Sequence, residues 1–206
     1  MGLALASHPT VIKDCVSLNW QRFEDHRGVF YEAFNEQAFK EAGLPELWPQ
    51  DNISISKASV LRGLHMQANN PQGKLVRCLV GRVLDVCVDL RPESPSFGLW
   101  HAELLEGSKA LFCPPGTAHG FYSITESVVY YKCTTLYDKE SDGGINPLDP
   151  KLAIPWEMYT PGFDKATLSD KDLRLPTLRE YMERHHARFE KKLLSTPLAE
   201  QSVLGL

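Results

Sequence analysis

The stretch "KLVRCLVGRVLDVCVDL", residues 74–90, decides the fold of this chain. Two runs rich in aliphatic and β-branched residues flank the dipeptide Gly81-Arg82, a composition typical of two β segments joined by a tight turn. Further runs follow as "SFGLWHAELL", "KALFCPPG" and "SVVYYKCTTLY", with turn residues between them. Short strands at a spacing of roughly 8–12 residues predict a sandwich or barrel. We expect it to occupy residues 10–135.

Two helices are expected outside these strands. One is "NEQAFKEAGL", which ends at Gly43. The other begins after Thr177 in "TLREYMERHHARFEKKLL", where Thr177 and Glu180 have the spacing of a capping box. We therefore predict a β domain over residues 1–176 and a helical extension over 177–206, packed on the barrel or on a second subunit. One stripe of that helix carries Leu178, Tyr181, Met182, His185 and Phe189.

The composition excludes several classes of protein. The chain has 206 residues, of which 43% are hydrophobic and 23% charged, as in an ordinary globular domain. A formal net charge of −4 gives no bulk attraction to nucleic acid or to an anionic membrane. The apolar runs are too short to span a bilayer, and the first residues lack the basic region of a signal peptide. Five scattered cysteines, none in a CxxC pair, fit a reducing cytoplasm.

The candidate chemistry centres on "VLRGLHMQ", residues 60–67, where His65 follows Arg62, and on Lys74 shortly after it. Histidines on a β-barrel suggest a metal, but the usual sites have two histidines one residue apart, and Met66 and Gln67 stand here instead. Metal binding is therefore the weaker alternative. The stronger one is acid–base chemistry, in which a histidine takes a proton from carbon beside a ketone. A lysine then stabilises the enolate oxygen, and a tyrosine returns a proton from the opposite face.

Several segments together resemble the dTDP-4-dehydrorhamnose 3,5-epimerase family. They run in family order over about residues 10 to 175. The resemblance implies a mainly β, cupin-type jelly roll with a few short helices, forming a cytoplasmic homodimer. It also implies a nucleotide-sugar substrate, no metal and no organic cofactor. The matching segments are "DHRGVFYEAFN", "QDNISISKASVLRGLHMQ", "PQGKLVRCLVGRVLDVCVDLRPESPSFGLW", "PPGTAHGFYSI", "YYKCTTLYDKES", "DPKLAIPW" and "LSDKD".

The resemblance also assigns roles to individual residues. His65 looks like the general base, and Asp172 like the carboxylate that pairs with it. Lys74 matches the lysine near the C4 oxygen of the sugar, and Tyr131 matches the acid that reprotonates the ring. His119 matches a further substrate contact. The remaining matches are positions that bind the substrate, mainly its nucleotide: Arg27, Phe30, Glu32, Gln50, Asp51, Asn52, Arg62, Tyr137, Asp142 and Lys171.

This sequence departs from the family pattern at a few positions. Met66 stands where tyrosine is common, Leu136 where an aromatic is frequent, Thr135 where aspartate is common, and Asp142 where glutamate is usual. None of these is a predicted catalytic residue. They leave open whether C3, C5 or both centres are inverted, and Leu136 beside Tyr137 is the position expected to influence that choice.

The first prediction is an epimerase that inverts C3 and C5 of dTDP-4-keto-6-deoxyglucose. The alternative within the same class is a single-centre epimerase of an unusual deoxysugar pathway. A 3,4-ketoisomerase is disfavoured, because "RGLH", "QGKLVR" and "AHGF" match the epimerase pattern better. A non-catalytic or metal-binding cupin is the alternative from another class.

Overall fold

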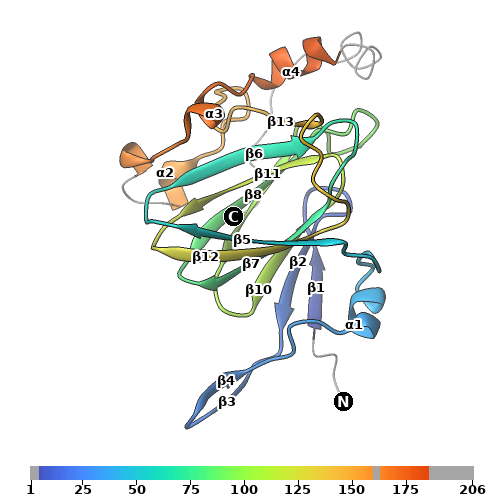
Figure 1. The fold of residues 1–206 in the computed structure, drawn as a ribbon, viewed down its shortest axis with the longest axis vertical. Coiled ribbons are helices and arrows are strands. Elements are labelled where there is room, and N and C mark those ends of the chain that lie inside the picture. The colour runs from blue at the N-terminus through green and yellow to red at the C-terminus, as the bar shows by residue number, and fades with distance from the viewer. Residues whose placement is uncertain (1–4, 160–162, 186–206) are drawn as a thin grey trace.

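Two antiparallel sheets form the body of the molecule in a computed structural model that describes residues 5–159 and 163–185 (Figure 1). The six-stranded sheet has the order β1 (Leu5–Pro9), β2 (Val16–Trp20), β10 (Lys109–Cys113), β7 (Lys74–Val80), β12 (Ser127–Cys133) and β5 (Gln50–Ser56). The five-stranded sheet has the order β13 (Asp142–Gly144), β6 (Leu61–Gln67), β11 (Thr117–Ser123), β8 (Val83–Asp89) and β9 (Trp100–Leu105). This arrangement confirms the predicted mainly β class.

The interior between the sheets is filled by alternate residues of the facing strands. Val76 and Cys78 of β7 meet Cys87 of β8, Phe121 of β11 and Val129 of β12 in one buried cluster. Successive side chains of a strand point to opposite faces, so the residues between these ones face outward. The site described below uses the inward-facing positions of this same interior.

Both sheets also bury part of their outer faces. Val86 and Val88 of β8 point away from the interior into a second cluster, which the C-terminal segment covers with Trp156, Leu178 and Met182. Every residue of β8 is therefore buried, which explains why its sequence is almost continuously apolar. The third cluster lies outside the six-stranded sheet, where the first helix packs.

The turn at Gly81 joins two strands that do not pair with each other. β7 belongs to the six-stranded sheet and β8 to the five-stranded sheet, so the chain crosses between the layers at this point. Gly81 has φ +82°, and a Cβ there would lie 2.8 Å from the Thr125 hydroxyl, so the turn requires glycine. The predicted segments and their tight turn are confirmed, and the structure adds that they lie in opposite sheets.

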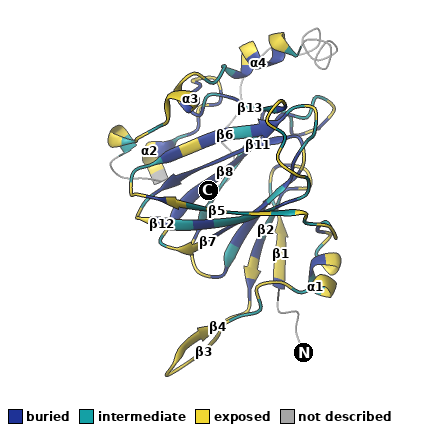
Figure 2. Ribbon diagram, in the orientation of Figure 1, coloured by how far each residue is buried: buried dark blue, intermediate teal, exposed yellow. Residues whose placement is uncertain are grey.

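A separate β-ribbon extends away from the body. It consists of β3 (Phe23–Asp25) and β4 (Gly28–Phe30), and all of its residues are exposed. In Figure 1 it projects beyond the lower edge of the sheets, and Figure 2 shows it exposed along its length. Phe30 at its end is 72% exposed, which is unusual for an aromatic side chain. The ribbon contributes little to the core of its own chain.

The helices are short and lie at the two ends of the molecule. α1 (Glu36–Glu41) is capped by the Asn35 side chain and is followed by Gly43 at φ +71°, which confirms the prediction for this segment. Above the five-stranded sheet lie α2 (Trp156–Tyr159), the 3₁₀ turn η1 (Phe163–Lys165), α3 (Asp170–Leu173) and α4 (Leu178–Arg184) (Figure 1). Across the described residues, no helix is long and apolar enough to cross a membrane.

The start of the C-terminal extension has the predicted local structure. Thr177 and Glu180 cap α4 reciprocally, as a capping box requires. Leu178, Tyr181 and Met182 are buried against the five-stranded sheet of the same chain, each side chain contributing roughly 2 kcal/mol. His185 is the C-cap, and Phe189 lies outside the described residues.

Candidate active site

Two motif glycines allow β6 and β11 to approach closely. A Cβ on Gly63 would lie 2.6 Å from the Cα of Gly120 and 2.7 Å from the carbonyl oxygen of His119, and Gly63 has φ +110°. A Cβ on Gly120 would collide in turn with the carbonyl oxygen of Arg62. The glycines of "RGLH" and "AHGF" are therefore required by this approach, which makes His65 and His119 direct cross-strand partners.

His65 is held by a carboxylate from the C-terminal segment. Its Nε2 lies 2.6 Å from Oδ1 of Asp172, whose Oδ2 accepts a hydrogen bond from the Gly63 N–H at 3.4 Å. Ser169 caps α3 and accepts from the Asp172 N–H, which places the carboxylate over β6. Burial is the largest single influence on the pKa of Asp172 and raises it. The hydrogen bond and charge interaction with His65, together with the hydrogen bonds from Gly63 and Ser169, outweigh burial, so the net pKa lies below the ordinary value. When Nε2–H donates to this carboxylate, Nδ1 of His65 keeps a lone pair for a proton.

His119 forms a second histidine–aspartate pair deeper in the interior. Its Nε2 lies 2.7 Å from Oδ1 of Asp85 on β8. The His119 side chain is 7% exposed, compared with 30% for His65, and Asp85 has no exposed surface. Burial raises the pKa of Asp85 above its ordinary value, although the contact with His119 opposes that rise. The sequence offered no sign of Asp85, because it stands in an apolar strand 34 positions before its partner.

Lys74 and Tyr131 reach the same interior from the opposite sheet. Tyr131 of β12 packs against the inter-sheet cluster, and Lys74 of β7 is the cross-strand partner of Cys133 two residues further along β12. Burial lowers the pKa of Lys74, and charge interactions with Cys133, Cys113, Asp142 and Asp85 partly oppose this. Burial raises the pKa of Tyr131, which keeps its phenol protonated near neutral pH. His65 therefore lies on one sheet, while Lys74 and Tyr131 lie on the facing sheet, with Tyr131 packed against the interior between them.

Three other predicted residues, Arg62, Asn52 and Gln50, make hydrogen bonds on β5 and the strands near it. Arg62 donates from Nε to the Ser56 hydroxyl at 3.0 Å, so it joins β6 to β5, and its positive charge lowers the pKa of Tyr131 in opposition to burial. Asn52 donates to the Cys133 thiol, and Gln50 donates to Asn52.

Asp51, which lies between Gln50 and Asn52 along β5, points the other way. Its carboxylate binds the Lys132 ammonium at 3.0 Å and accepts from Tyr130 on the outer face of the sheet. Strand alternation explains the separation, because adjacent residues of a strand face opposite sides. Within one chain the structure does not bring Asp51 to the other predicted site residues.

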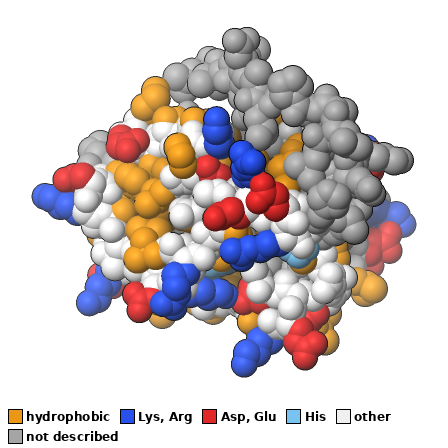
Figure 3. Space-filling model, turned by 90° about the horizontal axis from the view of Figure 1, so that it is seen from above, with side chains coloured by type: hydrophobic (Ala, Val, Ile, Leu, Met, Phe, Trp, Pro, Cys, Tyr) orange, Lys and Arg blue, Asp and Glu red, His pale blue; other side chains and the backbone are white. Residues whose placement is uncertain are grey.

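Tyr137, Asp142 and Lys171 form an exposed cluster. Oδ2 of Asp142 accepts from the Tyr137 hydroxyl at 2.9 Å and from the Lys171 ammonium at 2.6 Å. A cavity of about 460 Å³ adjoins it, lined by Asp142, Lys171, Arg174 and α4 among others. Figure 3 views this end of the molecule from above and shows basic and acidic side chains side by side.

Buried glutamines hold the segment that carries Tyr137. Gln67 donates to the Leu136 carbonyl and accepts from the Asp138 N–H, while Gln72 donates to the Thr135 carbonyl. Gln50 accepts from the Tyr137 N–H at 2.7 Å. In the sequence, Gln67 stood out only because it occupies a position where a metal site would have a ligand. Its neighbour Met66 faces the outer cluster and cannot contact the group around His65.

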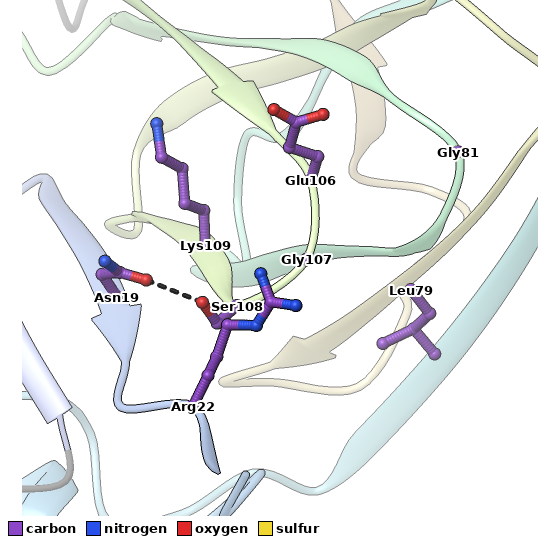
Figure 4. Close-up of a pocket in the computed structure, with 8 residues that line it drawn as sticks. All are labelled: Asn19, Arg22, Leu79, Gly81, Glu106, Gly107, Ser108 and Lys109. Carbon is purple, nitrogen blue, oxygen red and sulfur yellow. Dashed lines mark hydrogen bonds between the residues drawn. The ribbon is translucent and has the colours of Figure 1, made fainter. Parts of the chain in front are cut away.

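Arg27, Phe30 and Glu32 lie away from this group. Arg27 and Phe30 are on the exposed β3–β4 ribbon, where Arg27 pairs with Asp25 at 2.6 Å. Glu32 accepts from Asn35 just before α1. A further cavity of about 580 Å³ lies near the base of the ribbon and contains none of the predicted site residues. Figure 4 shows its polar lining, in which Ser108 donates to Asn19.

Comparison with known proteins places the chain in a family. The pattern of the dTDP-4-dehydrorhamnose 3,5-epimerases matches residues 9–180, so the chain belongs to that family of nucleotide-sugar isomerases. The dTDP-4-dehydrorhamnose 3,5-epimerase of Escherichia coli is 46% identical over 83% of this chain and 93% of its own. The crystal structure of dTDP-6-deoxy-D-glucose-3,5-epimerase from Legionella pneumophila, in complex with dTDP-4-keto-L-rhamnose, is 40% identical, with a TM-score of 0.79 over 85% of this chain and 93% of that one. The dTDP-4-dehydrorhamnose 3-epimerase of Streptomyces niveus is 40% identical over 66% of this chain and 69% of its own.

Proposed function

We propose that this protein is a dTDP-4-dehydrorhamnose 3,5-epimerase that inverts C3 and C5 of dTDP-4-keto-6-deoxyglucose. The observation that carries the proposal is the placement of His65, which pairs with Asp172 of α3, on one sheet and of Tyr131 and Lys74 on the facing sheet. A base and an acid on opposite walls can act on the two faces of a sugar ring bound between them. Membership of the family and the name shared by its curated relatives support the same activity.

The proposed reaction begins with removal of a proton from carbon. Nδ1 of His65 takes the proton from C3 or C5, which are acidic because both carbons adjoin the C4 ketone. The electrons of the broken C–H bond move to the C4 oxygen and form an enolate. The Lys74 ammonium donates a hydrogen bond to that oxygen, and its partly desolvated position strengthens the interaction.

Inversion requires that the new proton arrive from the other face. The Tyr131 phenol gives its proton to the carbon, the C4 ketone forms again, and the proton held by His65 passes to solvent as Tyr131 is reprotonated. The net reaction exchanges one carbon-bound hydrogen for a solvent proton with opposite configuration. Asp172 is a positioning residue here, because it orients the His65 ring and stabilises its charged form without touching the sugar.

The remaining predicted residues bind the substrate in this proposal. Arg62 holds the diphosphate beside the base, and His119 contacts the sugar from the strand next to His65. Gln50 and Asn52 line the nucleotide side of the interior, with Tyr137 at its edge. No metal or organic cofactor takes part.

We infer a homodimer, and the position of the ribbon supports it. Arg27 and Phe30, two of the predicted nucleotide contacts, project away from the site of their own chain (Figure 1). The outer face of β5 also exposes Ile53 (65%) and Ile55 (69%), apolar surface suited to a partner. In the proposed dimer, the ribbon of one protomer completes the nucleotide site of the other. Sedimentation analysis of Ile53→Asp tests this, since a monomer with weakened dTDP binding is expected.

The second candidate is an epimerase of one centre only. The relative from Streptomyces niveus is named a 3-epimerase, and Leu136 departs from the family pattern next to Tyr137.

We also propose that the enzyme is cytoplasmic, whichever centre it inverts, because its buried free thiols fit a reducing compartment.

Proton NMR of dTDP-4-keto-6-deoxyglucose incubated with the protein in heavy water tests the proposal. Deuterium at both C3 and C5, with a rhamnose-type product trapped by a ketoreductase, is expected. Deuterium at one carbon only would establish the second candidate, and no exchange would refute both.

A further inference from the structure

A second group of ligating side chains lies behind His119. Asp85, Cys113 and His119 come from β8, β10 and β11, and all three are buried. A carboxylate oxygen, the thiol sulfur and a ring nitrogen of these residues all lie within 4.8 Å of one another. The reaction proposed above uses neither Asp85 nor Cys113 as a reacting group.

These three atom types are the ligands that zinc prefers in proteins. In a tetrahedral zinc site the ligand atoms lie ~3.5 Å apart, so small side-chain movements would bring this group to that spacing. Further sulfur donors are near, because Cys15 and Cys87 belong to the same buried cluster as Cys113. Cys87 is also the cross-strand partner of His119. The group can therefore offer a fourth donor from the same interior.

A separate observation concerns the second carboxylate oxygen of Asp85, which has no hydrogen-bond partner among the described residues. Oδ2 of Asp85 is buried and makes no hydrogen bond with the described residues, while Oδ1 is engaged by His119. Asp85 has no exposed surface. An unpartnered carboxylate oxygen in an apolar interior is unfavourable, and a cation bound to it would remove that penalty.

Occupation of this group would affect the neighbouring reaction. Lys74 is the cross-strand partner of Cys113, so a cation on that sulfur would lie beside the Lys74 ammonium. Binding would also fix the His119 ring and, by repulsion between like charges, disfavour the protonated Lys74 that stabilises the enolate oxygen in the proposed reaction. We propose that Asp85, Cys113 and His119 form an inhibitory site for a thiophilic divalent cation, with Zn²⁺ as its probe. The inhibitory effect rests on the proposed function, whereas the binding does not.

Calorimetric titration of the metal-free full chain with Zn²⁺ tests the binding. One ion per chain is expected, and Cys113→Ser should weaken its affinity tenfold or more. Cys78→Ser is the matched control, because Cys78 is a buried thiol of the same core that donates to the Val80 carbonyl outside the group. Its affinity should not change. Co²⁺ bound to the unmodified protein should show a thiolate charge-transfer absorption band that Cys113→Ser lacks.

The folded state of each variant is checked by thermal unfolding, and Cys113→Ala replaces Cys113→Ser if the serine prevents folding. Equal Zn²⁺ affinity in the Cys113 variant and the unmodified chain would overturn the site. Failure of Zn²⁺ to bind the unmodified chain would overturn it equally.

The inhibition is measured by deuterium exchange into the sugar. Zn²⁺ should suppress exchange in the unmodified chain and in Cys78→Ser, a chelator should restore it, and the Cys113 variant should remain active with Zn²⁺ present. Binding without suppression would overturn the inhibitory role. Absence of exchange before Zn²⁺ is added would instead refute the proposed function, while the calorimetric result would stand.

Discussion

The two histidine–aspartate pairs are alike in geometry and differ in their surroundings. His65 and His119 lie opposite each other on neighbouring strands, with nitrogen–oxygen distances of 2.6 and 2.7 Å to their carboxylates. The outer pair keeps its histidine 30% exposed, and hydrogen bonds hold the pKa of Asp172 low. The inner pair is buried, and burial raises the pKa of Asp85. The comparison teaches that the solvation and hydrogen bonding of the carboxylate, more than the pairing distance, distinguish the environment of His65, the proposed base, from that of His119.

Replacing Asp172 and Asp85 in turn should distinguish the two histidine–aspartate pairs by the size of the loss in kcat. Asp172→Asn keeps the shape of the side chain but removes the charge that stabilises protonated His65, so we expect kcat for exchange to fall roughly 10²-fold. Asp85→Asn should reduce kcat less than about tenfold, because Asp85 pairs with His119, which in our proposal contacts the substrate and is not the base. Steady-state kinetics of both variants on the nucleotide sugar provide the measurement. A larger loss of kcat in Asp85→Asn would reverse the roles of the two pairs.

Tyr131→Phe should separate carbon–hydrogen cleavage from inversion. The variant keeps His65 and Lys74, so we expect the washout of substrate hydrogen to fall by less than about tenfold. Formation of the inverted product should fall by roughly 10²-fold or more, because in the proposed reaction its proton comes from the phenol. Both rates can be followed in one NMR time course. If the two rates fell equally, Tyr131 would not be the acid.

The two carboxylates should influence stability with opposite dependence on pH. The folded-state pKa of Asp172 is lowered, so it adds stability above its unfolded pKa of about 3.9 and loses it as pH falls through the folded value. The folded-state pKa of Asp85 is raised, so its contribution to stability falls as pH rises from about 3.9 through the folded value.

Denaturant unfolding between about pH 3 and about pH 6 measures this difference. Compared with the unmodified chain, Asp172→Asn should gain less stability with rising pH, and Asp85→Asn should gain more. Slopes that change in the same direction for both variants would contradict the contrast between the pairs.

The smallest expected effect is at Leu136. It is 62% exposed beside Tyr137, and its carbonyl accepts from Gln67. Leu136→Tyr should change the ratio of C3 to C5 exchange several-fold with little change in the total rate, because the substitution lies at the edge of the proposed sugar site and leaves His65, Lys74 and Tyr131 unchanged. An unchanged ratio would show that another part of the chain selects the centre.

Local patterns in the sequence predicted the strands well. The β7 and β8 segments, the α1 helix and the capping box of α4 all agree with the structure. Strand partners could not be predicted, because hydrophobic alternation shows which residues are buried but not which sheet a strand joins. The separation of β7 from β8 therefore came only from the structure, which also places Lys74 of β7 and His65 of β6 on different sheets.

The candidate site was predicted in part. The position of His65 in its motif suggested a base, but Asp172 is 107 positions away and was assigned only through the resemblance. Asp85 was missed because nothing local marks a carboxylate whose partner is on another strand. Asp51 and Asn52 face opposite sides because they are adjacent on β5, a strand that the sequence did not single out. Arg27 and Phe30 lie on the β3–β4 ribbon, which in our proposal reaches the nucleotide site of a second chain, and a single sequence carries no local sign of such a contact.

The most direct test of the account compares His65→Ala with His119→Ala in heavy water, using proton NMR to follow exchange at C3 and C5. We predict that His65→Ala loses exchange at both carbons by roughly 10³-fold or more while still binding dTDP. His119→Ala should keep measurable exchange at both carbons, with a raised KM. Normal exchange in His65→Ala, or complete loss in His119→Ala alone, would contradict the assignment of His65 as the base.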